Sequence, residues 1–222
     1  MTNPAPDQSD LAAALFCTMG GSMPHRHEYE EKARELAASL PSKEKRLLKV
    51  VSLCGFPLKT PKQLYIAEKA YSWLGAEYRK EIIKYSTMYL NTDGWRELPH
   101  ATISEDGVMV NQTARSRASV YADLAQAQEG EGHYEAALSN FMEAYRLEPY
   151  NAMYAIKAAD VIAEFRTREE ALNFLNQQKH SRYYSPTKYT DSRGGRGRND
   201  TFQQLLNAHI LKLQEANAGP SW

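Results

Sequence analysis

Apolar residues recur every three to four positions through most of this chain, with polar and charged residues between them. This period is typical of amphipathic helices that bury one face. Glycine and proline interrupt the pattern at short intervals, as at Pro41, Gly55 and Gly75, because neither residue continues a helix well. The sequence therefore predicts an all-α protein. Besides a brief candidate at 9–16, the stretches expected to be helical are 28–39, 43–54, 61–74, 78–90, 152–164, 168–178 and 200–216. Two further helices are expected up to residue 149, and the first of them begins at about residue 110 or 114.

Short polar side chains stand where several of these helices should begin. Ser42, Asn151 and Thr167 can each accept a hydrogen bond from a backbone N–H in the first turn of a helix. Glu170 lies three residues after Thr167, which is the spacing of a capping box, and Asp200 is followed by a glutamine at the same spacing. We therefore expect helices to start directly after these residues.

Two stretches depart from the helical pattern. Residues 1–27 are rich in Pro, Gly, Ser and Thr around one short apolar run, and we expect them to form a flexible tail or a loosely docked helix. Residues 92–113 contain the turn dipeptides Asp93-Gly94 and Asp106-Gly107. Apolar residues flank the second dipeptide, so residues 101–110 could form a small hairpin, while a surface loop is equally consistent with such short arms.

The most specific pattern lies in residues 118–149. Ala125, Ala137 and Ala144 are small where two helices would cross closely, and Phe141 supplies one large ring to fill the gap. Gly132 separates the two helices. Residue types and spacing together resemble one tetratricopeptide repeat, a pair of antiparallel helices that stacks on similar pairs. Ala125 is a departure, since glycine is commoner at that position in the family.

Residues 62–91 and 152–179 resemble the same family more loosely. In the first of them Glu81 replaces the small residue usually found early in the second helix. The resemblance implies a right-handed superhelix of helix pairs that ends in a capping helix over 200–216. We expect one domain over residues 28–222, made of N-terminal helices and a degenerate repeat (28–91), an insertion loop (92–113), repeats (114–179), a basic loop (180–199) and the capping helix.

Proteins of this family bind peptides or helices along a concave face lined by the first helix of each pair. The resemblance therefore implies a non-catalytic adaptor or regulatory module that binds a protein segment. Some family members grip a C-terminal carboxylate with Lys and Asn, but Ala122 and Gln126 occupy those positions here, so that type of ligand is not expected. The residues implied on the face are Ser119, Ala122, Gln126, Glu129, Met153, Ile156, Asp160 and Ala163.

Charge is balanced overall and uneven along the chain. Lys plus Arg and Asp plus Glu number 27 each, so net charge suggests neither nucleic acid nor a membrane as partner. Residues 118–149 are strongly acidic, whereas 28–91 and 179–198 are more basic, which favours a basic protein partner or self-association. A solvated face is the simpler alternative. No apolar run approaches the ~18 residues of a membrane span, and we expect a cytoplasmic protein.

The segment 179–198 supports a second hypothesis. It combines Arg193, Arg196 and Arg198 with Tyr183 and Tyr184, and arginine beside glycine and aromatic rings can bind single-stranded nucleic acid. A single run of this kind is weak evidence, and a solvated loop is the alternative.

Few side chains suggest a reaction. Cys17, His25 and His27 match no zinc-ligand spacing, and Cys54 lies on an apolar stripe and is expected to be a core thiol. The sequence contains no Gly-rich phosphate loop and no nucleophile elbow. We therefore expect no metal, no cofactor and no enzymatic activity.

Overall fold

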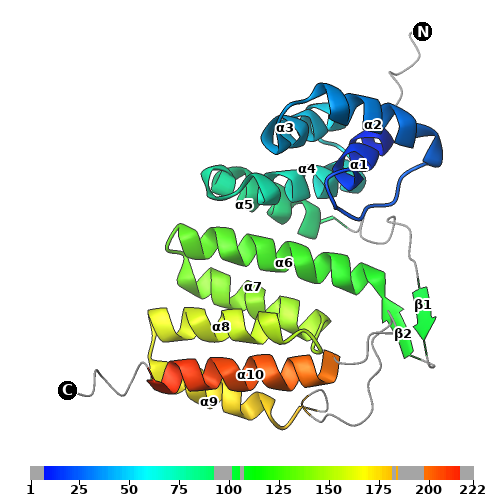
Figure 1. The fold of residues 1–222 in the computed structure, drawn as a ribbon. Helices are drawn as coiled ribbons and strands as arrows, with labels where there is room; N and C mark the ends of the chain where they lie inside the picture. The colour runs from blue at the N-terminus through cyan, green and yellow to red at the C-terminus, as the bar shows by residue number, and fades with distance from the viewer. Residues whose placement is uncertain (1–7, 93–101, 106–107, 182–183, 185–197, 216–222) are drawn as a thin grey trace. The chain divides into compact units, whose positions relative to one another are not determined.

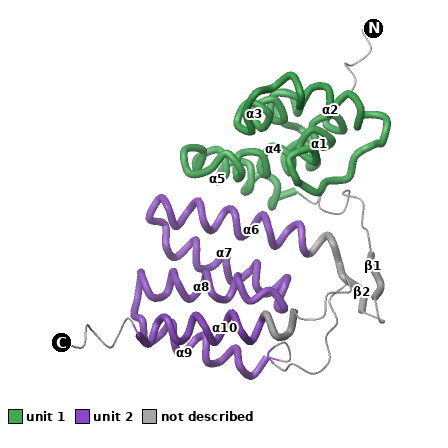
Figure 2. Tube along the Cα trace, in the orientation of Figure 1, with its two compact units in different colours: residues 1–99 green, residues 100–222 purple. Residues whose placement is uncertain are grey.

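The computed structural model describes residues 8–92, 102–105, 108–181, 184 and 198–215, which are all-α apart from one small β-hairpin. The chain divides into two compact units, residues 1–99 and residues 100–222 (Figures 1 and 2). The sequence predicts a single domain over 28–222, whereas its N-terminal helices and its clear repeat fall in different units. We call these unit 1 and unit 2 and describe each by itself.

Helix α1 (Ser9–Cys17) is central to unit 1 and packs against α2, α3 and α4. Every side chain from Leu11 to Phe16 is at most 3% exposed. The prediction of a flexible tail is therefore wrong for this helix, because its apolar residues are buried on all sides by other helices. The remaining α-helices of unit 1 are α2 (Glu30–Ser39), α3 (Lys43–Cys54), α4 (Pro61–Leu74) and α5 (Arg79–Leu90), with short 3-10 helices at His27–Tyr29 and Ala76–Tyr78.

Local signals account for the helix boundaries in unit 1. The Ser42 side chain accepts a hydrogen bond from the backbone N–H of Lys45, which confirms the predicted start of α3. Thr60 and Gln63 form a complete capping box at the start of α4. Gly75 ends α4 with a φ of 103°, a left-handed conformation that favours glycine.

Unit 2 begins with a β-hairpin, so the hairpin alternative for residues 101–110 is confirmed. Strands β1 (Thr102–Glu105) and β2 (Val108–Asn111) pair antiparallel, with Ile103 opposite Val110. Helix α6 starts directly after β2. The helices of unit 2 are α6 (Gln112–Gly130), α7 (Tyr134–Leu147), α8 (Ala152–Phe165), α9 (Arg168–Gln178) and α10 (Arg198–Glu215).

The helices of unit 2 pack in sequence, α6 on α7, α7 on α8 and α8 on α9. Phe141 is surrounded by small residues, including Ala125, Ala137 and Ala158, as the repeat pattern predicts. Asn151 and Thr167 cap α8 and α9 through side-chain hydrogen bonds, which confirms both predicted starts. Helix α10 packs on α8 and α9 and buries a further apolar cluster with them, so it covers the end of the repeat as expected.

Candidate protein-binding face

The first helix of each pair in unit 2, together with α10, contributes to one face that we call the A-helix face. On α8, four residues of this face follow one another at intervals of four, three and four: Met153, Lys157, Asp160 and Glu164. This spacing places them on the same side of the helix. The same intervals hold along α6, and α10 adds residues beside α8. The A-helix face comprises Arg115, Ser119, Ala122, Gln126 and Glu129 on α6, Met153, Lys157, Asp160 and Glu164 on α8, and Leu205 and His209 on α10.

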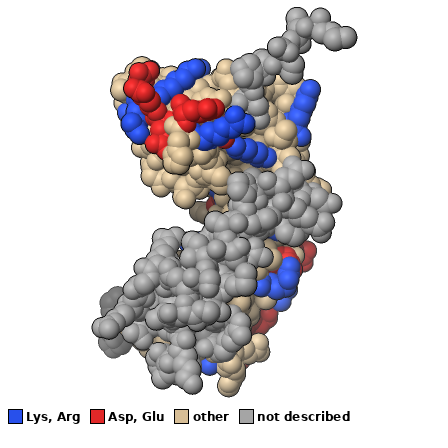
Figure 3. All heavy atoms as spheres, turned by 90° about the vertical axis from the view of Figure 1, so that its right-hand side faces the viewer, with Lys and Arg blue, Asp and Glu red and all other residues tan. Residues whose placement is uncertain are grey.

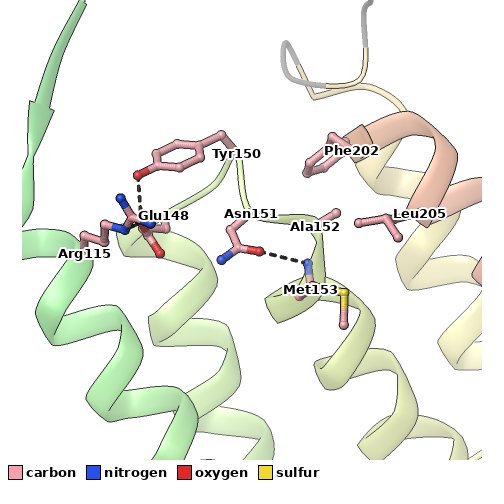
Figure 4. Close-up of a pocket in the computed structure, with 8 residues that line it drawn as sticks. All are labelled: Arg115, Glu148, Tyr150, Asn151, Ala152, Met153, Phe202 and Leu205. Carbon is pink, nitrogen blue, oxygen red and sulfur yellow. Dashed lines mark hydrogen bonds and ion pairs between the residues drawn. The ribbon is translucent and has the colours of Figure 1, made fainter. Parts of the chain in front are cut away.

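A pocket of about 250 Å³ opens on this face at the N-terminal ends of α8 and α10 (Figure 4). Phe202 is fully buried in the pocket wall, while Met153 and Leu205 are 42% and 37% exposed. An apolar side chain that stays exposed in a folded protein gains free energy when a partner covers it. The volume suits a side chain better than a cofactor, since small-molecule pockets are usually larger.

The polar side of the same pocket satisfies its own hydrogen bonds. The Glu148 carboxylate is almost completely buried, and the Tyr150 hydroxyl donates a hydrogen bond to it at 2.7 Å. Arg115 Nε lies 3.6 Å from the same carboxylate oxygen. Asn151 accepts a hydrogen bond from the backbone N–H of Met153 and so caps α8. Since the cation in this pocket already has a buried anion beside it, the pocket favours an apolar group over an anionic ligand.

The opposite end of the face is acidic. Burial raises the pKa of the Glu129 carboxyl; nearby Lys157 lowers that pKa, and Glu164 and Asp160 raise it again. Lys157 lies 4.0 Å from Asp160, so one cation stands among three carboxylates. The C-terminal ends of α6 and α8 add partial negative charge at this end of the face. A cationic side chain is therefore the group that this end attracts most strongly.

Two contacts hold the acidic end in place. His209 Nε2 on α10 lies 2.8 Å from Asp160 Oδ1 on α8. The Tyr134 hydroxyl donates a hydrogen bond of 2.8 Å to Glu164, which raises the pKa of that tyrosine. These partners come from α7 and α10, so the acidic end depends on the packing of four helices, α6, α7, α8 and α10.

The structure places most of the predicted groove residues on this face and moves one of them into the core. Ile156 is only 5% exposed and packs with Phe202 and Leu206, because α10 covers that side of α8. Ala163 is half-buried against the same cluster. The predicted groove did not include Lys157, Glu164 or the α10 residues. Counting four, three and four residues from Met153 along α8 would have identified Lys157 and Glu164. The α10 residues become visible only once α10 is seen to pack beside α8.

The basic segment proposed for nucleic-acid binding lies largely outside the described residues, and so do Tyr183, Arg193 and Arg196. Arg198 is the first residue of α10. Tyr184 donates a hydrogen bond to Asn207 and packs against the α10 cluster. Because its ring is already engaged, Tyr184 is a poor stacking platform for a base.

Cys17 and His25 come close together in unit 1, with 3.7 Å between the sulfur and Nδ1. The same imidazole nitrogen lies 2.9 Å from the Met23 carbonyl oxygen, so it donates a proton there and cannot accept one from the thiol. Burial raises the pKa of Cys17, which disfavours the reactive thiolate. Cys54 is buried, as predicted. No group of three or more His, Cys, Asp or Glu within the described ranges has the geometry to hold a metal ion.

The side of unit 1 that faces the viewer in Figure 3 carries charges of both signs. There, Lys and Arg side chains lie beside Asp and Glu side chains. Near α1, Asp10 contacts both Lys62 Nζ at 2.6 Å and Arg26 Nε at 3.2 Å. Such neutralised surfaces attract no particular charged ligand, so the A-helix face of unit 2 is the stronger candidate.

The pairs α6–α7 and α8–α9 pack in chain order, so unit 2 is a helical repeat built of helix pairs. No protein-family model matches the chain, and no curated protein matches it. Among solved structures, the crystal structure of the MamA protein aligns with 98% of this chain and 98% of its own, at 13% sequence identity and a TM-score of 0.48. In the described part of the chain, no helix has both the length and the apolar character needed to cross a membrane.

Proposed function

We propose that this protein is a non-catalytic interaction module that binds a segment of another protein on the A-helix face of unit 2. The observation that carries the proposal is the pocket between α8 and α10, where two large apolar side chains remain exposed beside a row of charged residues. Apolar anchors within a polar rim are typical of protein interfaces. As an adaptor or regulatory protein, it would act by binding a partner segment on this face and would not catalyse a reaction.

The internal satisfaction of the polar groups supports this function over catalysis. Glu148, the buried carboxylate of the pocket, is held by Tyr150 and Arg115 and is poorly placed to exchange a proton with a substrate. The thiol of Cys17 has a raised pKa, and the His25 nitrogen beside it is engaged with the Met23 carbonyl oxygen. Nucleic-acid binding through residues 179–198 stays an alternative prediction.

Charge reversal across the face tests the proposal. The variant Gln126→Arg plus Asp160→Arg places two cations at the acidic end and removes the contact with His209. We expect proteins captured by the wild-type chain from its own cell lysate to be lost or strongly reduced, as measured by quantitative mass spectrometry.

Matched substitutions on the second helices provide the control. Glu135→Arg plus Asn173→Arg makes the same change in net charge, +3, at exposed positions of α7 and α9. This control variant should capture the same partners as the wild type. Circular dichroism verifies that all variants are folded. If the face variant retains every partner at unchanged recovery, the proposed binding face is wrong.

A further inference from the structure

The two ends of the A-helix face differ in chemistry and lie on one helix, so the distance between them is fixed. Met153 at the pocket and Asp160 at the acidic end are seven residues apart on α8, which corresponds to roughly 10 Å along the axis. Glu164 lies eleven residues from Met153, or roughly 16 Å. A ligand that contacts both ends must therefore carry two different groups at this separation.

The pocket end selects an apolar group. Phe202 closes the wall, and Met153 and Leu205 remain exposed at the opening. Among the described residues that line this pocket, the two charged side chains, Arg115 and Glu148, contact each other. An anion here would have to displace a buried carboxylate, whereas a Leu, Met or Phe side chain would only displace water.

The other end selects a cation by charge complementarity. Lys157 contacts Asp160 and acts on Glu129, which Glu164 and Asp160 also influence, so three carboxylates stand against one lysine at this end. His209 contacts Asp160 from α10 and adds positive charge only when it is protonated. A Lys or Arg at this end would pair with several carboxylates at once, and an acidic side chain would be repelled.

We infer that the occupant of this face is an extended peptide segment with an apolar anchor and a Lys or Arg three to five residues from it. An extended chain advances roughly 3.3 Å per residue, so these separations span roughly 10 to 16 Å. The inference rests on the proposed function and adds the chemistry of the ligand to it.

Selection from a random dodecapeptide library on the purified full-length chain tests the spacing without a known partner. The expected result is enrichment of an apolar residue with Lys or Arg three to five positions away. A synthetic peptide of that pattern should bind in fluorescence anisotropy. Replacing its basic residue by Glu should weaken binding roughly tenfold, and raising the salt concentration should weaken the original peptide.

Substitutions in the chain assign each end. Leu205→Glu should abolish binding, whereas Leu211→Glu, on another side of the same helix and more exposed, should leave it unchanged. Asp160→Lys plus Glu164→Lys should reverse the preference, so that the Glu-containing peptide binds better than the Lys-containing one. The peptide substitution needs no change in the protein and therefore tests the charge rule even if that variant fails to fold.

Three results overturn the inference. Enrichment of acidic residues, or no positional pattern, contradicts the ligand chemistry; if the lysate capture still depends on the face, the proposed function stands alone. A chain that dimerises in light scattering, and becomes monomeric on Leu205→Glu, would identify a second copy as the occupant. Unchanged peptide binding by Leu205→Glu would place the site elsewhere.

Discussion

In the α6–α7 pair the helices cross over alanines, whereas in the α4–α5 pair they cross over tyrosine rings. Ala125 and Ala137 are fully buried and share one apolar cluster with the ring of Phe141. In unit 1, Tyr71 of α4 stacks on Tyr85 of α5 with 5.5 Å between ring centroids. An antiparallel helix pair can therefore be stabilised in two ways, by small residues that let the backbones approach closely or by aromatic rings that pack on each other.

This difference explains why one repeat is clear in the sequence and the other is degenerate. Close crossing demands a small residue at each contact, so the alanine pattern is strict and visible. Ring packing tolerates a larger neighbour, and Glu81 can stand early in α5, half-exposed, where the family prefers a small residue. Loss of the sequence signature does not mean loss of the helix pair.

The largest effect is expected at the position early in the second helix of each pair, which is Ala137 in α7 and Glu81 in α5. Ala137→Glu places a carboxylate in a fully buried site and should destabilise unit 2 by at least about 3 kcal/mol. Glu81→Ala in unit 1 should change stability by no more than about 0.5 kcal/mol. Urea denaturation followed by far-UV circular dichroism measures both. Similar losses for the two variants would show that the pairs do not differ in how closely they cross.

The next largest effect should come from the tyrosine packing of unit 1, which should make the protein less stable at alkaline pH. Burial, together with nearby groups of which Tyr85 is the first, raises the pKa of Tyr71 to about 12. A folded-state pKa above the unfolded value gives stability that is complete below pH 10 and is lost as pH rises through about 12.

The variant Tyr71→Phe tests this dependence. Its urea midpoint should fall less between pH 8 and pH 11 than that of the wild type, because it has no phenol to ionise. An equal fall in both proteins would contradict the assignment to Tyr71.

The helix caps offer a comparison of intermediate size. Thr60 belongs to a capping box with two hydrogen bonds, while Thr167 accepts one from the Glu170 backbone. Changing either to Ala should cost about 1 kcal/mol, and Thr60→Ala the more of the two. Ser at either position keeps the hydroxyl and should restore most of the stability in thermal denaturation. No change for Thr60→Ala would mean that packing alone fixes the start of α4.

The smallest expected effect concerns Glu129, which has no counterpart in the ring-packed pair. Its raised pKa means that the charged form is disfavoured in the folded state, so stability is complete below the usual value of 4.5 and declines above it. Glu129→Gln should therefore stabilise unit 2 at pH 7 by less than about 0.5 kcal/mol after solvent screening, roughly 1–2 °C in Tm. The gain should vanish near pH 4, and scanning calorimetry at both pH values checks it.

The sequence by itself determined the features that depend on a few neighbouring residues. Ser42, Asn151 and Thr167 each cap the helix they were expected to start, and Gly75 and Gly132 end helices with positive φ. The alanine spacing around Phe141 also predicted which faces of α6 and α7 meet. Such signals are local, because a cap or a turn is completed within about four residues of the chain.

Only the tertiary structure decided which apolar surfaces are covered. The run from Leu11 to Phe16 suits an exposed tail helix as well as a core helix, and its burial depends on the arrival of α2, α3 and α4. Docking of α10 likewise buried Ile156 and brought His209 to Asp160. The pocket joins residues from 115 to 205. These contacts depend on the packing of distant helices, and no local pattern carries that information.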